Sequence, residues 1–135
     1  LCAGTGAVGI EALSRGANHA TFIDKSRKMC GLIEENLDLL KIPEEQTAIF
    51  NSSAEDFLRR SEEIWNIIFF DPPYASNYFD VLQYFKTEKP PFIAEDGILI
   101  VEHTTKIMMP DSLGELRRWR LLKQGDSSLS FYENK

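Results

Sequence analysis

Residues 3–9 read Ala3-Gly4-Thr5-Gly6-Ala7-Val8-Gly9, and this stretch decides the fold class. Its glycines follow the spacing Gly-x-Gly-x-x-Gly, and Ile10-Glu11-Ala12-Leu13 continues with a helical period. Glycine permits a tight turn from a strand into a helix and lets a ligand approach the backbone closely. The helix N-terminus presents unpaired N–H groups to an anion. The stretch therefore predicts the nucleotide-binding turn of an α/β protein.

A carboxylate follows the next predicted strand. Ala20-Thr21-Phe22-Ile23 is a short, mostly apolar run, and Asp24 ends it, 20 residues after Gly4. That separation suits a carboxylate that accepts hydrogen bonds from both hydroxyls of a ribose. The glycines alone would be explained equally well by a tight strand–helix turn. Together with Asp24 they predict a site for a nucleoside cofactor.

A second unusual stretch begins at Asp71. The preceding run, Trp65-Asn66-Ile67-Ile68-Phe69-Phe70, is typical of a buried central strand of a parallel sheet. Asp71-Pro72-Pro73-Tyr74 follows it directly. Each proline fixes its own φ and lacks an N–H, so the turn is stiff and rich in hydrogen-bond acceptors. The Asp71 carboxylate and the Pro72 carbonyl could together accept both N–H groups of a planar amine, and Tyr74 could stack on its ring.

This acceptor-rich turn suits the activation of an amine. An aryl amine is a poor nucleophile because its lone pair is delocalised into the ring. Holding both N–H bonds out of water favours a pyramidal nitrogen whose lone pair can be aimed at an electrophile. We therefore predict that Asp71, Pro72, Pro73 and Tyr74 are catalytic. The alternative is a purely structural turn, with Tyr74 packed on the surface.

The rest of the chain alternates predicted strands and helices. Helices are expected at residues 27–41, 54–60, 78–85 and near 112–117, strands at 47–50 and 98–102, and a hairpin at 119–123 and 129–133. This order predicts an α/β fold with a doubly wound, mostly parallel sheet and a C-terminal antiparallel hairpin. Ligands bind beyond the carboxyl ends of such strands. We therefore expect Gly4 and Gly6, Asp24, Ser53 and the Asp71 turn to meet in one crevice.

Ser53 and Ala54 follow the strand predicted at residues 47–50. Ser53 and the backbone near Ala54 could hydrogen-bond the edge of an adenine. Ser53 is at least as well suited to cap the helix that begins there.

Composition limits the possible functions. A chain of 135 residues forms one domain, and a net charge of −6 argues against its wrapping nucleic acid alone. The sequence shows no apolar run of the ~20 residues that span a membrane and no signal-peptide pattern. Cys2 and Cys30 lack metal-site spacing and are expected to be reduced thiols. We expect a cytoplasmic monomer without a metal. Because the chain enters the glycine turn after only Leu1-Cys2, we also expect its first strand to be truncated.

These stretches resemble class I S-adenosylmethionine-dependent methyltransferases, and more closely the bacterial 16S rRNA guanine-N2 methyltransferases of the guanine-966 type. The similarity rests on residues 1–17, on Phe22-Ile23-Asp24-Lys25 and on Asp71-Pro72-Pro73-Tyr74. It implies methyl transfer from S-adenosylmethionine to guanine N2, in small-subunit rRNA or its assembly intermediate. The implied cofactor-binding residues are Ala3, Gly4, Thr5 and Gly6 for the methionine part, Asp24 and Lys25 for the ribose, and Ser53 and Ala54 for the adenine.

The resemblance also implies that Asp71 and Pro72 hold guanine N2, with Tyr74 against a base flipped out of the RNA. Two departures are expected to matter. Ser53 stands where the family usually has Asp or Asn, and the family's N-terminal strand and basic arm are absent from residues 1–135. We expect this single methyltransferase domain, taken alone, to be weakly stable and poorly active because loss of a central strand exposes two sheet edges.

Three alternatives stay open at this point. In the first alternative, the turn at Asp71 holds a different amine: adenine N6 of DNA or RNA, or the side-chain amide of glutamine. A fragment of an NAD-binding oxidoreductase would also use the glycine turn and Asp24. A remnant that binds only a cofactor or the ribosome is the third.

Overall fold

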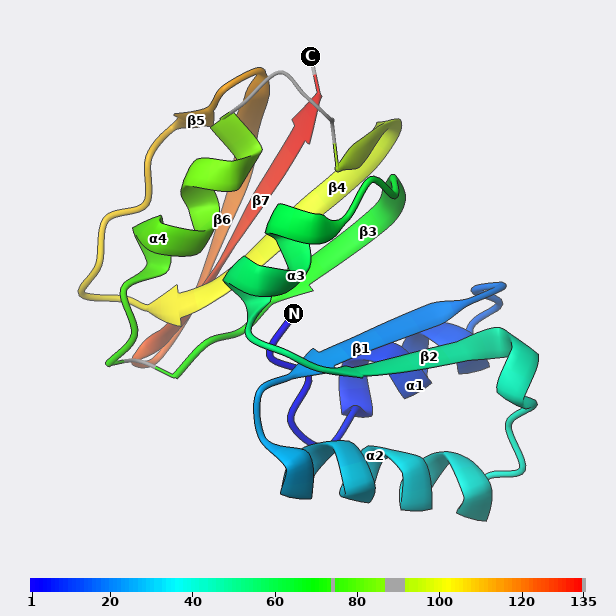
Figure 1. Cartoon of the computed structure of the whole chain (residues 1–135). Helices are drawn as coiled ribbons and strands as arrows, with labels where there is room; N and C mark the ends of the chain where they lie inside the picture. Colours follow the sequence, from blue (N-terminus) through cyan, green and yellow to red (C-terminus); the bar gives the residue numbers. More distant parts are fainter. Residues whose placement is uncertain (74, 87–91, 135) are drawn as a thin grey trace. The chain divides into compact units, whose positions relative to one another are not determined.

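The computed structural model describes residues 1–73, 75–86 and 92–134. The chain divides into two compact units, Leu1–Phe57 and Leu58–Lys135. Figure 1 labels their helices and strands.

The first unit is built on two parallel strands, β1 (Ala20–Asp24) and β2 (Thr47–Asn51). Its helices are α1 (Ala7–Ser14), α2 (Arg27–Leu39) and the short 3-10 helix η1 (Glu44–Gln46). Phe22 of β1 forms a core with Ile33 and Leu37 of α2, and Ile10 of α1 packs against it. Both helices therefore cover the face of β1 that carries Phe22 (Figure 1).

The strand and helix predicted between residues 27 and 50 are confirmed. Ser26 caps α2 by accepting a hydrogen bond from the Met29 N–H at 3.3 Å, and α2 ends two residues earlier than predicted. The pairing of β1 with β2 sets Ala20 beside Thr47 and Asp24 beside Asn51, so that the two carboxyl ends lie together.

The second unit contains a five-stranded sheet in the order β3-β4-β7-β6-β5. Its strands are β3 (Trp65–Phe70), β4 (Ile93–Thr104), β5 (Ser112–Leu113), β6 (Leu116–Gln124) and β7 (Ser127–Asn134). Strand β3 runs parallel to β4, and the other neighbours are antiparallel. Helix α3 (Ala54–Arg60) leads into this unit, and α4 (Tyr78–Leu82) continues as the 3-10 helix η2 (Gln83–Lys86).

Helix α4 packs on one face of this sheet. The ring of buried Tyr78 meets Phe70 of β3 edge-on at 6.3 Å and His103 of β4 at 6.5 Å. Within the same face the His103 Nδ1–H donates to the Thr104 carbonyl at 2.9 Å, so its Nε2 accepts from the Ser130 hydroxyl at 2.8 Å. Burial lowers the pKa of His103, which keeps the ring neutral. His103 is therefore a satisfied core residue.

The α/β class and the C-terminal hairpin are confirmed. Gly125, at φ 62°, turns β6 into β7 through a two-residue loop, and the paired strands are longer than predicted. The parallel pairing is divided between two separate sheets, one in each unit.

Three local predictions are wrong. The helix expected near 112–117 is instead β5 and the start of β6, because Gly114, at φ 60°, turns the chain so that Leu113 pairs with Leu116. The strand expected at 98–102 begins five residues earlier than predicted, because residues 93–97 also belong to β4. The run 65–70 forms a strand as predicted, but β3 is an edge strand of its sheet and Ile67 is 58% exposed. An apolar run predicts that the two faces of a strand are covered, but it does not tell whether the strand is paired with another strand on both edges.

The helix predicted at 78–85 is confirmed in its position, with a change of helix type after Leu82. Leu82 and Phe85 are buried, but Phe79 is 45% exposed because Tyr78 and Val81 take the buried side of this short helix.

Within residues 1–73, 75–86 and 92–134, no helix combines the length and apolar character of a membrane span. Cys2 and Cys30 carry thiols rather than a disulfide, as predicted.

Candidate functional site

The glycine turn of the first unit has the backbone conformation that its sequence predicts. Gly4 and Gly6 have φ angles of 58° and 82°, which L side chains rarely adopt. The Gly6 N–H donates to the Ala3 carbonyl at 2.9 Å, and the Ala3 N–H donates to the Ile23 carbonyl at 2.8 Å. A Cβ built on Gly4 would meet no atom within 4 Å, so the backbone there is open to a ligand.

Asp24 braces this turn through both carboxylate oxygens. Its Oδ2 accepts a hydrogen bond from the Gly4 N–H at 2.9 Å, and its Oδ1 accepts from the Ser26 N–H at 2.8 Å. An ionised carboxylate offers about four lone-pair positions, so each oxygen keeps room for one further donor. Asp24 can therefore hold the turn and still accept ribose hydroxyls. The bracing role is a finding that the sequence pattern did not indicate.

The ends of β1 and β2 are tied together beside Asp24. The Ser52 N–H donates to the Asp24 carbonyl at 3.0 Å. The Asn51 side-chain amide donates to the Asp24 carbonyl at 3.2 Å and to the Lys25 carbonyl at 3.0 Å. Asn51 was not among the predicted site residues, because its contacts depend on strand pairing across more than twenty residues of sequence. The first unit thus brings the predicted glycine, ribose and Ser53 positions to neighbouring strand ends.

Ser53 caps helix α3. Its hydroxyl oxygen accepts a hydrogen bond from the Asp56 N–H at 3.1 Å, and its carbonyl accepts from the Phe57 N–H at 3.1 Å. Glu55 and Asp56 in the first turn add favourable charge at the helix N-terminus. The interpretation of Ser53 as an N-cap is confirmed, and the adenine contact stays a prediction.

We expect Ser53→Ala to lower the free energy of unfolding by about 1 kcal/mol, the usual cost of losing an N-cap oxygen. Ser53→Asp restores an acceptor and should unfold like the wild type in urea. Calorimetric titration with S-adenosylhomocysteine then separates the two roles of Ser53, because a cap alone leaves the affinity of both folded variants unchanged. An alanine variant as stable as the wild type would contradict the capping assignment.

Asp71 lies beside Glu102 in the second unit. The parallel pairing sets Phe69 beside Ile100 and Phe70 beside Val101, so Asp71, the first residue after β3, follows in register with Glu102 of β4. Burial and the neighbouring Glu102 carboxyl raise the pKa of Asp71 to about 7. A partly protonated carboxyl at neutral pH is typical of functional sites.

The two prolines differ in their surroundings. Pro72 is buried and Pro73 is exposed. The Pro73 carbonyl accepts a hydrogen bond from the Ser76 N–H at 2.9 Å, which closes the turn. Within the part of the chain that the structure describes, the Pro72 carbonyl accepts none. Tyr74 lies outside the described residues. The catalytic roles of all four residues stay predictions, as does their meeting with the first unit's residues in one crevice.

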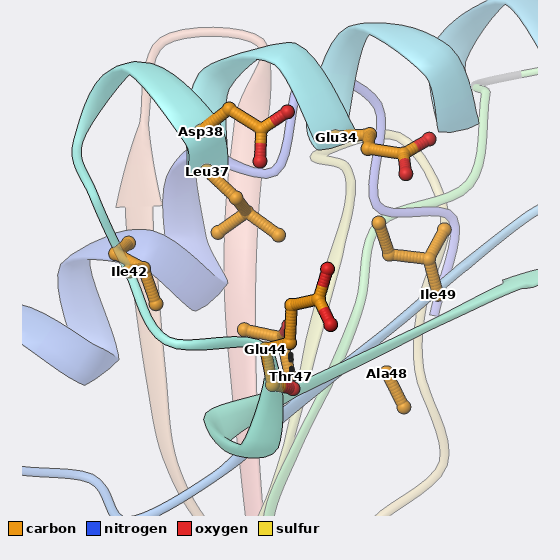
Figure 2. Close-up of a pocket in the computed structure, with 8 residues that line it drawn as sticks. All are labelled: Glu34, Leu37, Asp38, Ile42, Glu44, Thr47, Ala48 and Ile49. Carbon is orange, nitrogen blue, oxygen red and sulfur yellow. Dashed lines mark hydrogen bonds between the residues drawn. The ribbon is translucent and has the colours of Figure 1, made fainter.

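A pocket of about 350 Å³ opens between α2 and β2 (Figure 2). Glu34, Leu37 and Asp38 of α2 line it together with Ile42, Glu44, Thr47, Ala48 and Ile49. It lies at the start of β2, whereas Asp24 and Asn51 mark the carboxyl ends of the strands. Because α/β sheets bind ligands beyond those carboxyl ends, we place the candidate site there and not in this pocket.

Residues 1–133 match the family model described as "Conserved hypothetical protein 95". YlbH of Bacillus subtilis, provisionally named an rRNA methyltransferase, is 30% identical over 138 residues, which cover 100% of this chain and 74% of that protein. Ribosomal RNA small subunit methyltransferase D of Haemophilus influenzae is 32% identical over 125 residues, covering 78% of this chain and 65% of its own length. A solved structure, a conserved hypothetical protein of Streptococcus pyogenes, aligns with a TM-score of 0.88 at 26% identity, covering 98% of this chain and 82% of that one.

Proposed function

The chain belongs to the family described as Conserved hypothetical protein 95, and from this premise we propose that it methylates the exocyclic N2 of a guanine in small-subunit ribosomal RNA. Its relatives in Haemophilus influenzae and Escherichia coli are named ribosomal RNA small subunit methyltransferase D. Its solved neighbours include proteins titled as methyltransferases, and its fold is the methyltransferase-like α/β fold. We propose S-adenosylmethionine as the methyl donor.

The first unit supplies the proposed cofactor site. Asp24 and Lys25 face the ribose, with Asp24 using the acceptor positions that the Gly4 and Ser26 N–H groups leave open. The open backbone at Gly4 supports close approach of the methionine part along residues 3–6. Ser53 and Ala54 take the adenine. When bound, S-adenosylmethionine supplies a methyl group made electrophilic by its sulfonium.

One observation carries the assignment of an amine substrate: at the end of β3 the Asp71 carboxyl adjoins a Pro72 carbonyl that accepts no hydrogen bond among the described residues. Two acceptors on a stiff turn suit the two N–H groups of an exocyclic amine. They orient the nitrogen so that its lone pair faces the methyl carbon. As the N–C bond forms and the S–C bond breaks, the nitrogen must lose one proton, and the Asp71 carboxylate can receive it.

We further propose that residues 1–135 act as the catalytic domain of a cytoplasmic, monomeric enzyme. Its partner is small-subunit rRNA or an assembly intermediate that contains it. Binding of S-adenosylhomocysteine without any methylation would instead indicate a remnant that only binds the cofactor.

The test is to identify the methylated product. The intact protein is incubated with methyl-tritiated S-adenosylmethionine and small-subunit rRNA that lacks the modification, and the RNA is digested to nucleosides. We expect the label in N2-methylguanosine. Parallel incubations contain DNA and a release factor. Label in N6-methyladenine or in a glutamine side chain would overturn the proposal, and tight NADH binding without S-adenosylhomocysteine binding would replace it with an oxidoreductase.

A further inference from the structure

Glu102 is the residue of β4 that faces the end of β3. From Gly97 onward, strand β4 alternates between buried and half-buried residues, with Val101 and His103 on the buried face and Glu102 on the other. The register of β3 and β4 brings Asp71 to that same half-buried side. On its other neighbour, β7, Glu102 pairs with the apolar Leu129. Glu102 is therefore the titratable group that faces Asp71 from the paired strands.

Burial and the Glu102 carboxyl, which faces Asp71 from the paired strand, raise the pKa of Asp71 to about 7. Two carboxylates repel each other at contact distance, so Asp71 holds its proton more tightly beside Glu102 than it would in water. Once Asp71 has ionised, its carboxylate can accept an N–H group, and a proton that it takes up can be shared with Glu102.

We propose that Glu102 is a positioning residue that holds Asp71 through a shared proton and tunes it to receive the proton that the methylated amine releases. The inference rests on the proposed function, since it assigns Asp71 to the amine. The N–C bond forms as the S–C bond of the donor breaks. The nitrogen then gives one proton to the Asp71 carboxylate, which shares it with Glu102 and later releases it to water.

The pairing can be tested without any activity. In the intact protein, the ¹³C chemical shift of the Asp71 carboxyl is followed by NMR from pH 4 to 9, in wild type and in Glu102→Gln. The glutamine amide keeps a hydrogen-bond donor but removes the neighbouring charge. We expect the Asp71 pKa to fall by at least about one unit in the variant. An unchanged Asp71 titration would overturn the pairing.

The catalytic part is tested by the pH dependence of single-turnover methyl transfer. In the wild type we expect the rate to rise through about pH 7 as Asp71 loses its proton and becomes able to accept the one that the amine releases. Glu102→Gln should shift this rise to lower pH by at least about one unit and lower the plateau roughly tenfold. Glu102→Ala should lower the plateau further, by roughly 10–100-fold, because Asp71 loses its support. Glu95→Gln, an exposed position on the same strand, is the matched control and should change neither.

The outcomes separate the two proposals. A wild type that methylates guanine, with a Glu102→Gln variant of equal rate and pH profile, overturns the role of Glu102 alone. A wild type that methylates no rRNA overturns the proposed function and the catalytic part of the inference with it, while the NMR titration still decides whether the pair exists.

Discussion

Replacing Gly9 with alanine is expected to destabilise the protein by about 2 kcal/mol, although alanine is the better helix former. Gly9 lies in α1, where a Cβ would come within 2.4 Å of Cε1 and 2.8 Å of Cζ of Phe22. Phe22 is 2% exposed and packs against Ile33, so its ring has little room to move away. The added methyl group therefore forces α1 and β1 apart.

Gly31 provides the matched control. It lies within α2, and a Cβ there would meet no atom within 4 Å. Gly31→Ala should therefore stabilise the protein by about 0.5–1 kcal/mol through helix propensity. Urea unfolding of both variants measures the two effects. If Gly9→Ala also stabilised the protein, the close contact between α1 and Phe22 would be refuted.

Replacing Asp71 with asparagine is expected to stabilise the protein by about 1–3 kcal/mol at pH 8, after allowance for solvent screening. The raised pKa of about 7 means that the folded protein binds this proton more readily than the unfolded chain, where the ordinary value is about 3.9. The carboxyl's contribution to stability is thus fully present below pH ~3.9 and is lost as the pH rises through about 7. The asparagine amide does not ionise, so the variant does not lose this stability as the pH rises.

The measurement is the difference in unfolding free energy between Asp71→Asn and wild type at several pH values. The advantage of the variant should grow from pH 5 to pH 8. His103, whose pKa burial lowers, makes acid destabilising in both proteins, so its contribution cancels in the difference. Asp96→Asn, at an exposed position, serves as the control. If the difference in unfolding free energy between Asp71→Asn and wild type did not change with pH, burial and Glu102 would not raise the pKa of Asp71.

Local sequence patterns predicted those features whose conformation is determined by neighbouring residues in the chain. Gly4 and Gly6 need positive φ angles, Ser26 caps the helix that follows it, and Gly125 turns a two-residue hairpin. Each of these features is determined by residues within one turn of the chain. The family resemblance added the expected roles of Asp24 and of the Asp71 turn.

Features that depend on strand pairing could not be predicted in the same way. Asn51 reaches the Asp24 carbonyl, and Glu102 reaches Asp71, only because particular strands pair in a particular register. The error at 112–117 has the same origin, since β6 forms by pairing with β7 and overrides the weak helical pattern around Gly114. Pairing between distant segments leaves no signal in either segment alone.

The central claim is that the Asp71 carboxylate, with the Pro72 carbonyl, grips a planar amine during methyl transfer. The most direct test is the single-turnover rate of methyl transfer to small-subunit rRNA by the intact protein carrying Asp71→Ala, at saturating cofactor, with S-adenosylhomocysteine affinity measured alongside. We predict a loss of about 10³-fold in rate with unchanged affinity. An Asp71→Ala protein that methylates rRNA at the wild-type rate would contradict the account.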